Sequence, residues 1–183
     1  MSCTIGGAPD YGCDGRKSAA GLKQYGYLGN LEDIVFVRGA DDIITSFTIV
    51  PTKQLYKFTV PPKANDAGYE LQQGDAGNPS FKYILNAQFS ASSQAQRKLV
   101  EDLIYATNTV AFIVTNGNII TVLGAGDGLS VEAATQTSGK LGTDNNLHQI
   151  TLTGEGNEIP PQYLDTDFDT SITALEAALT PAV

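Results

Sequence analysis

The chain of 183 residues has no tryptophan, one histidine, one methionine and two cysteines. Two cysteines, Cys3 and Cys13, cannot form a disulfide framework, and a zinc site takes about four ligands. We expect free thiols in a reducing compartment, with a Cys3–Cys13 bond as the open alternative.

Proton-transfer chemistry needs a positioned partner, and the sequence around His148 shows none. No stretch approaches the ~18 apolar residues of a membrane span, and the first fifteen residues lack the apolar segment of a secretory signal.

Positive charge is missing from the end of the sequence. After Lys140 the chain has seven acidic residues and no lysine or arginine, and the net charge is −9. A protein with this balance cannot bind nucleic acid by neutralising phosphates, and an acidic surface repels nucleic acid. The sequence therefore excludes a nucleic-acid-binding module, although plain solubility would also explain the acids.

Glycine, serine and threonine are plentiful, and this composition favours strands and turns. Alternating apolar residues predict strands, and Asn116-Gly117 between two β-branched runs predicts a hairpin with a type I′ turn. The short gap between the runs at 41–51 and 55–62 predicts a second hairpin. The predicted strands are 33–37, 41–51, 55–62, 81–91, the hairpin 109–123, 128–137 and 147–154.

The apolar period changes to that of a helix over about 92–107, where one stripe holds Leu99, Val100, Leu103 and Ile104. A short second helix is expected near the C-terminus, at 169–179. The fold class is mainly β: a barrel or sandwich of antiparallel strands with one flanking α-helix. We expect an extended N-terminal arm over 1–30, a β-barrel domain with the inserted helix over 31–164, and a short helix and tail over 165–183. Residues 61–80 are expected to form a long loop, with a short strand within 68–72.

The segment VLGAGDGLSV (122–131) resembles a phosphate-binding loop at first sight. A dinucleotide fingerprint needs G-x-G-x-x-G followed by a helix, but here the third glycine comes one residue early and a strand-like run follows. No Lys-Ser/Thr pair completes a Walker loop either. We interpret Gly124–Gly128 as a tight turn between strands.

The segment DTDFDTSITALE (165–176) places Asp165, Asp167, Asp169 and Glu176 at ligand positions of a calcium loop. Thr170 stands where such loops need glycine, and two prolines interrupt the preceding segment. The alternative is a helix start, where acids favour the macrodipole and Thr173 with Glu176 would form a capping box. We expect no calcium here, and more generally no catalytic residue, cofactor or metal.

Three segments carry a resemblance to a known family: YGYLGNLEDIVF (25–36), the strand, helix and hairpin of 81–129, and the strand pair and exit of 134–164. In order and type, these elements resemble tail-tube proteins of tailed bacteriophages, whose fold is shared with the inner-tube protein of type VI secretion. The resemblance covers about half of the chain. It implies a virion structural protein, assembled in the bacterial cytoplasm, that is not an enzyme.

The resemblance further implies a homo-oligomeric ring, usually hexameric and stacked, that meets other tail proteins and lets DNA pass without binding it specifically. It implies no contact with a membrane. A baseplate, ring or tail-terminator protein would have a similar sequence. A carbohydrate- or receptor-binding β-sandwich is the next alternative, and a small-molecule enzyme is the third.

Apolar anchors among glycines mark the segments expected to contact other subunits. Neither the arm nor the loop has a periodic apolar face with which to bury itself, so a neighbouring subunit would supply the pocket. These interface candidates are Ile5, Tyr11, Leu22, Tyr25, Tyr27, Tyr69 and Leu71.

Overall fold

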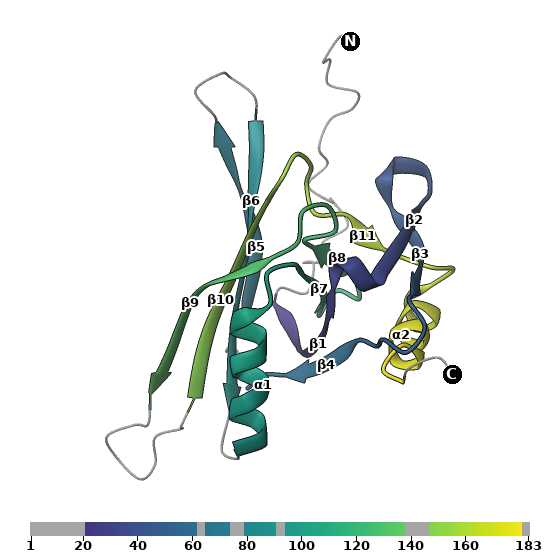
Figure 1. Cartoon of the computed structure of the whole chain (residues 1–183). Helices are drawn as coiled ribbons and strands as arrows, with labels where there is room; N and C mark the ends of the chain where they lie inside the picture. The colour runs from purple at the N-terminus through teal and green to yellow at the C-terminus, as the bar shows by residue number, and fades with distance from the viewer. Residues whose placement is uncertain (1–20, 62–64, 74–78, 91–93, 138–146, 181–183) are drawn as a thin grey trace.

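The computed structural model describes residues 21–61, 65–73, 79–90, 94–137 and 147–180. The predicted mainly β fold is confirmed: two mostly antiparallel sheets pack against each other like a sandwich, and neither closes into a barrel (Figure 1). The strands are β1 (Leu22–Asn30), β2 (Ile34–Arg38), β3 (Ile44–Ile49), β4 (Tyr56–Thr59), β5 (Asp66–Gln73), β6 (Pro79–Ser90), β7 (Thr109–Thr115), β8 (Ile120–Leu123), β9 (Ser130–Thr137), β10 (Leu147–Gly156) and β11 (Gln162–Tyr163). The helices are α1 (Gln94–Tyr105) and α2 (Phe168–Ala177), with short 3₁₀ turns at Leu31–Asp33 and Ala40–Asp42.

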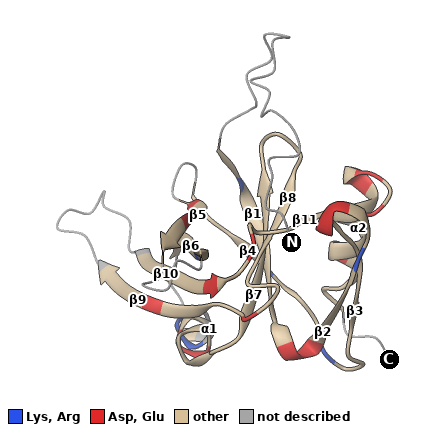
Figure 2. Ribbon diagram, turned by 90° about the horizontal axis from the view of Figure 1, so that it is seen from above, with Lys and Arg blue, Asp and Glu red and all other residues tan. Residues whose placement is uncertain are grey.

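Sheet A has seven strands in the order β2-β3-β11-β8-β7-β1-β4, and sheet B has four in the order β5-β6-β10-β9. The pairs are antiparallel except for the short β11–β3 contact. Figure 2 shows sheet B on one side, β1, β7 and β8 in the middle, and β2, β3 and α2 on the other side. Sheet A therefore curls: its own strands β2 and β3, together with α2, cover the face of β1, β7 and β8 that lies away from sheet B.

Two apolar cores result from this layering. The first lies between the sheets, with Leu28, Ile113 and Leu123 of sheet A meeting Leu85 and Leu152 of sheet B. The second lies on the opposite face of sheet A, and its buried residues include Tyr27, Phe112, Val122, Tyr163 and Leu175. Strand β7 is buried from Thr109 to Val114 because both of its faces are covered. Leu175 of α2 is fully buried, so the terminal helix belongs to the same packed body.

The expectation of an N-terminal arm is wrong for residues 22–30, which form β1 between β7 and β4 in the middle of sheet A. This strand has no simple alternation because both of its faces are buried over Gly26–Gly29. Gly26 is required there, since a Cβ would lie 2.6 Å from the ring of Phe58 and 2.8 Å from the carbonyl oxygen of Phe112. Residues 1–20 of the expected arm lie outside the described residues.

The expected hairpin between 41–51 and 55–62 is also wrong. Strand β3 pairs with β2 and β11, whereas β4 crosses to β1. The long loop expected at 61–80 is replaced over much of its length by β5, which pairs with β6 from Asp66 to Gln73. A spacing of a few residues between two apolar runs does not decide which strands pair, because pairing depends on contacts far apart in sequence.

Local signals predicted the other elements well. The flanking helix, the β7–β8 hairpin and the terminal helix are confirmed. The hairpin turn differs in type: the left-handed residue is Asn118, with φ of 60°, so the loop has three residues rather than the two of a type I′ turn. Neither α1 nor α2, the helices of the described residues, is long and apolar enough to cross a membrane.

Candidate functional site

The glycine segment is a tight turn, as its spacing predicts. Gly124 and Gly128 have φ of 78° and 76°, and the Gly128 amide donates to the Gly124 carbonyl at 3.1 Å. A Cβ on Gly128 would lie 2.9 Å from the Cα of Asn108, so this position has no room for a side chain. Strand β9 follows instead of a helix, and the turn lacks the amide-rich helix start that binds phosphate.

The acids of 165–176 have structural partners. Asp167 is the N-cap of α2 and accepts from the Thr170 amide at 2.7 Å, which lowers the pKa of Asp167. The expected capping box at Thr173 and Glu176 is wrong, because the helix begins earlier, at Phe168. In the described part of the chain, no group of three or more His, Cys, Asp or Glu side chains is placed to hold a metal ion.

Glu176 joins the terminal helix to sheet A. Its carboxylate accepts hydrogen bonds from the Tyr27 hydroxyl at 2.6 Å and from Lys57 Nζ at 2.5 Å. The bond from Lys57, followed by the bond from Tyr27, lowers the pKa of Glu176. Burial, together with the nearby Glu176 carboxylate, raises the pKa of Tyr27. The Lys57 ammonium also lies 4.9 Å from the ring centre of Tyr25.

A second charged cluster fastens β2 to the segment after β10. Arg38 donates two bonds to the Glu158 carboxylate, at 2.8 and 2.5 Å, which lower the pKa of Glu158. The buried Tyr83 donates to the Glu158 carbonyl at 2.6 Å, and burial is the main reason why its pKa is raised. Each cluster thus holds together two elements that are far apart in sequence: α2 and sheet A in the first, and β2 and the segment after β10 in the second.

Two hollows lie on the surface of the described residues. One, of about 480 Å³, is lined by charged side chains that include Lys82, Asp127 and Glu132. The other, of about 380 Å³, lies between β3 and α2. His148 lines neither of them, and its Nε2 is buried with no hydrogen-bond partner among the described residues. In the first hollow the Lys82 ammonium lies 3.2 Å from a Glu132 oxygen, so charged groups of its lining pair with each other.

The seven interface candidates separate into different environments. Ile5 and Tyr11 lie outside the described residues. Leu22 and Tyr25 are partly buried against the first and the second core, and Tyr27 is fully buried within its own subunit. Tyr69 and Leu71 remain 48% and 57% exposed on β5. Among the described candidates, the two on β5 are the most exposed to another molecule.

Sheet B offers two open edges. In the part of the chain that the structure describes, no strand pairs with the outer side of β5 or of β9. Side chains along both strands are mostly exposed, and neither strand contains proline or lysine, the residues that protect edges in many proteins. The sequence analysis missed the open edge of β9, because a strand becomes an edge through long-range pairing.

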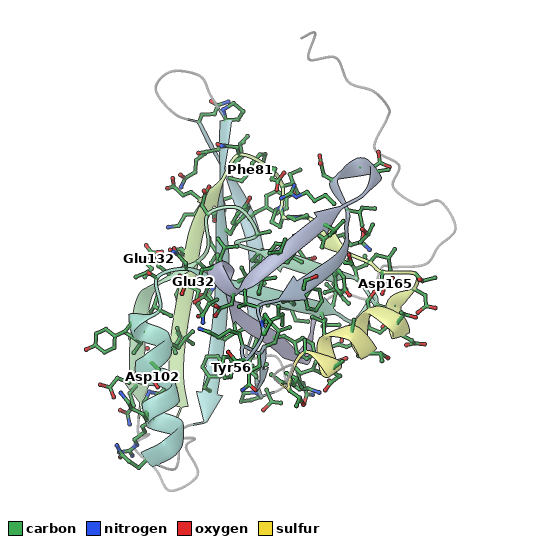
Figure 3. All side chains as sticks on the ribbon, turned by 45° about the vertical axis from the view of Figure 1, so that its right-hand side comes forward. Glu32, Tyr56, Phe81, Asp102, Glu132 and Asp165 are labelled. Carbon is green, nitrogen blue, oxygen red and sulfur yellow. The ribbon has the colours of Figure 1, made fainter. Side chains whose placement is uncertain are left out.

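Sheet B also has one solvent-facing side that is polar and acidic. Directly opposed residues of antiparallel strands share a side, so Asp66, Glu70 and Glu155 lie on the side opposite the core. Glu70 and Glu155 are directly opposite Lys82 on its two neighbouring strands. Lys82 Nζ lies 3.2 Å from a Glu132 oxygen on β9. Figure 3 labels Glu132, and Figure 2 shows its strand with an acidic segment in red. Three carboxylates, those of Glu70, Glu132 and Glu155, thus lie on strands next to Lys82 on this side of the described sheet.

Comparison with known protein families, curated proteins and solved structures found no match. The geometry of sheet B is therefore the basis for a functional proposal. The exposed tyrosines that a receptor-binding surface would gather, Tyr56, Tyr69 and Tyr105, lie on three different elements.

Proposed function

We propose that the protein is a structural virion protein of a tailed bacteriophage that forms oligomeric rings of the tail tube. In this proposal β5 of each copy pairs with β9 of the next, and the joined four-stranded sheets form the wall of a cylinder. The observation that carries the proposal is the relation between these two open edges. Their directions, their lengths and their stagger all suit such a closure.

The directions are compatible. The four strands of sheet B alternate in direction, so β5 and β9 run antiparallel to each other. Copies related by rotation about one axis therefore continue the antiparallel pattern when β5 of one meets β9 of the next. Both edge strands have eight residues, and β9 has a bulge at Glu132, where its register with β10 shifts. The new ladder can therefore match in register between residues 66–70 of β5 and residues 133–137 of β9, and the bulge lies beside Leu71.

The stagger along the sheet is that of a barrel wall. Asp66 at the start of β5 lies opposite Asn86 of β6. Thr137 at the end of β9 lies opposite Leu147 and, through it, level with Ser90, four residues further along β6. Four residues span about 13 Å and three strand spacings about 14 Å, so the strands would tilt by roughly 43°, within the usual range for barrels.

The size and charge of such a cylinder suit DNA. Six copies with four strands each would form a wall about 50 Å across between backbone centres, which leaves room for a duplex. With the core of each copy on the outside, the acidic side of sheet B would line the lumen. A surplus of carboxylates there would repel the phosphates of DNA, so that DNA could pass through the lumen without binding to the wall.

Microscopy of the purified protein tests the proposal. We expect rings or tubes in negative stain and a mass of several chains by light scattering, and compact monomers at all concentrations would contradict it. Ala134→Pro and Thr135→Pro sharpen the test, because neighbouring amides in a strand point to opposite sides. One of the two variants should disrupt the β9–β10 ladder, and the other should fold normally but fail to form rings.

A further inference from the structure

Two exposed apolar patches lie at opposite edges of sheet B. The β5 patch consists of Tyr69 and Leu71, which are 48% and 57% exposed. The α1 patch consists of Ile104 and Tyr105, which are 40% and 76% exposed. Both patches pair an aromatic with an aliphatic side chain, and the subunit contacts proposed so far, which are backbone hydrogen bonds, leave both uncovered.

The β5 patch lies on the core side of sheet B. Tyr69 is opposite Tyr83 and Leu71 is opposite Phe81, and Tyr83 is buried in the first core. The Tyr69 and Phe81 rings meet edge to face at 5.8 Å. At the top of Figure 1 the β5–β6 hairpin extends past the rest of the domain, and Figure 3 labels Phe81 on it. The patch is thus a strip of core-side surface that extends beyond the core.

The α1 patch lies on the same side of the sheet, beside β9. Val100 and Leu103 of α1 pack against the first core, and the helix contacts β9. The helix ends at Tyr105, shortly before Thr109, which forms a bridge with Leu129 directly ahead of β9. The end of α1 therefore lies close to the Ser130 end of β9.

We propose that Tyr69 and Leu71 of one copy pack on Ile104 and Tyr105 of the next. This inference rests on the proposed ring. If the two eight-residue strands pair level and antiparallel, the Leu71 end of β5 lies beside the Ser130 end of β9, on the α1 side. Each copy then covers one patch and offers the other, so the contact is heterologous and repeats around the ring. Burial of these four side chains adds apolar contact to a ladder of backbone hydrogen bonds.

Cross-linking tests this contact directly. Leu71→Cys and Tyr105→Cys are made separately in a Cys3→Ser/Cys13→Ser parent and treated with a short bis-maleimide. We expect neither variant alone to cross-link, and a mixture of the two to give a dimer and nothing larger. The double variant should give a ladder that ends at the mass of the closed ring. Rings without the mixed dimer, or single variants that cross-link to themselves, would overturn the contact.

The ring and the contact can fail separately. If the parent forms no rings, the proposed function fails together with this inference, whereas rings with no mixed dimer refute only the contact. As a second measurement, Leu71→Ser and Tyr105→Ser should each raise the concentration at which rings dissociate by about tenfold or more. Ile119→Ser is the matched control, because Ile119 is 45% exposed on the β7–β8 turn, away from both patches. The contact would be contradicted if Ile119→Ser raised the dissociation concentration as much as the patch variants do. It would also be contradicted if neither patch variant changed that concentration.

Discussion

The hydroxyl of Tyr27 donates a hydrogen bond of 2.6 Å to the carboxylate of Glu176, 149 residues later in the chain. Tyr27 belongs to the strand in the middle of sheet A, and Glu176 belongs to the terminal helix. Lys57 on β4 completes the group with its own bond to Glu176. The contact connects the two ends of the described chain and fixes α2 over the second core.

Tyr27→Phe removes this bond and should destabilise the protein by about 1 kcal/mol. This is less than the usual effect of a bond to a charged group, because the Glu176 side chain is 41% exposed and solvent screens its charge. Urea denaturation should show a lower midpoint at an unchanged slope. Tyr56→Phe on β4 is the control, since Tyr56 is 53% exposed, and it should leave the midpoint in place. Equal midpoints for Tyr27→Phe and wild type would show that the bond contributes nothing.

The same carboxylate makes stability depend on pH. Hydrogen bonds from Lys57 and Tyr27 lower the pKa of Glu176 in the folded state, so its stabilising effect is present above the ordinary glutamate pKa of about 4.3 and is lost as the pH falls below it. Glu176→Gln should therefore be less stable than wild type at pH 7, by about 0.5 kcal/mol for a solvent-screened pair. At pH 3 the difference should be smaller, because the pH then approaches the lowered pKa of Glu176 and its carboxylate begins to be protonated. A difference that is the same at both pH values would assign the effect to packing.

The α1 helix offers a test of what each side chain contributes. Leu103 packs against the first core, whereas Ile104 is 40% exposed. Leu103→Ala should lower the free energy of unfolding by about 2 kcal/mol, the low end for a leucine because this one is only half-buried. Ile104→Ala should change it by less than about 0.5 kcal/mol and weaken only assembly. Thermal unfolding and light scattering of both variants separate these effects. If Leu103→Ala were as stable as wild type, the packing of α1 on the core would contribute nothing to stability.

Sequence reasoning succeeded where structure is decided locally. The stripe that contains Val100 and Leu103 and the turn signal at Asn116-Gly117 each lie within one short segment, and α1 and the β7–β8 hairpin follow from them. It failed for β1, because a strand buried on both faces shows no alternation of apolar and polar residues. The glycines of this strand, such as Gly26, are also typical of loops. Tyr27 and Tyr69 have similar surroundings in sequence, yet one is buried and the other exposed. Their burial is decided by which strands pair, and that pairing joins segments far apart in the chain.

The glycine turn after β8 provides a matched pair of substitutions. Gly128 has φ of 76° and a Cβ there would lie 2.9 Å from Asn108, whereas a Cβ on Gly126 would meet nothing within 4 Å. Gly128→Ala should therefore destabilise the protein by about 1–3 kcal/mol through backbone strain and crowding, and Gly126→Ala should be close to neutral. Melting temperatures of the two variants measure the difference. Similar losses at both positions would mean that the whole loop, rather than the one residue, is sensitive.

The acids at the start of α2 distinguish helix capping from calcium binding. If Asp167 acts only as the N-cap that accepts from Thr170, Asp167→Ala should lower the melting temperature by about 2–4 °C. That loss should be the same with millimolar calcium and with a chelator, because the Glu176 carboxylate is already bonded to Tyr27 and Lys57. A calcium loop would behave differently: calcium would raise the melting temperature of the wild type and not of Asp167→Ala or Glu176→Ala. Calorimetric titration of the wild type with calcium completes the test, and we expect no saturable heat.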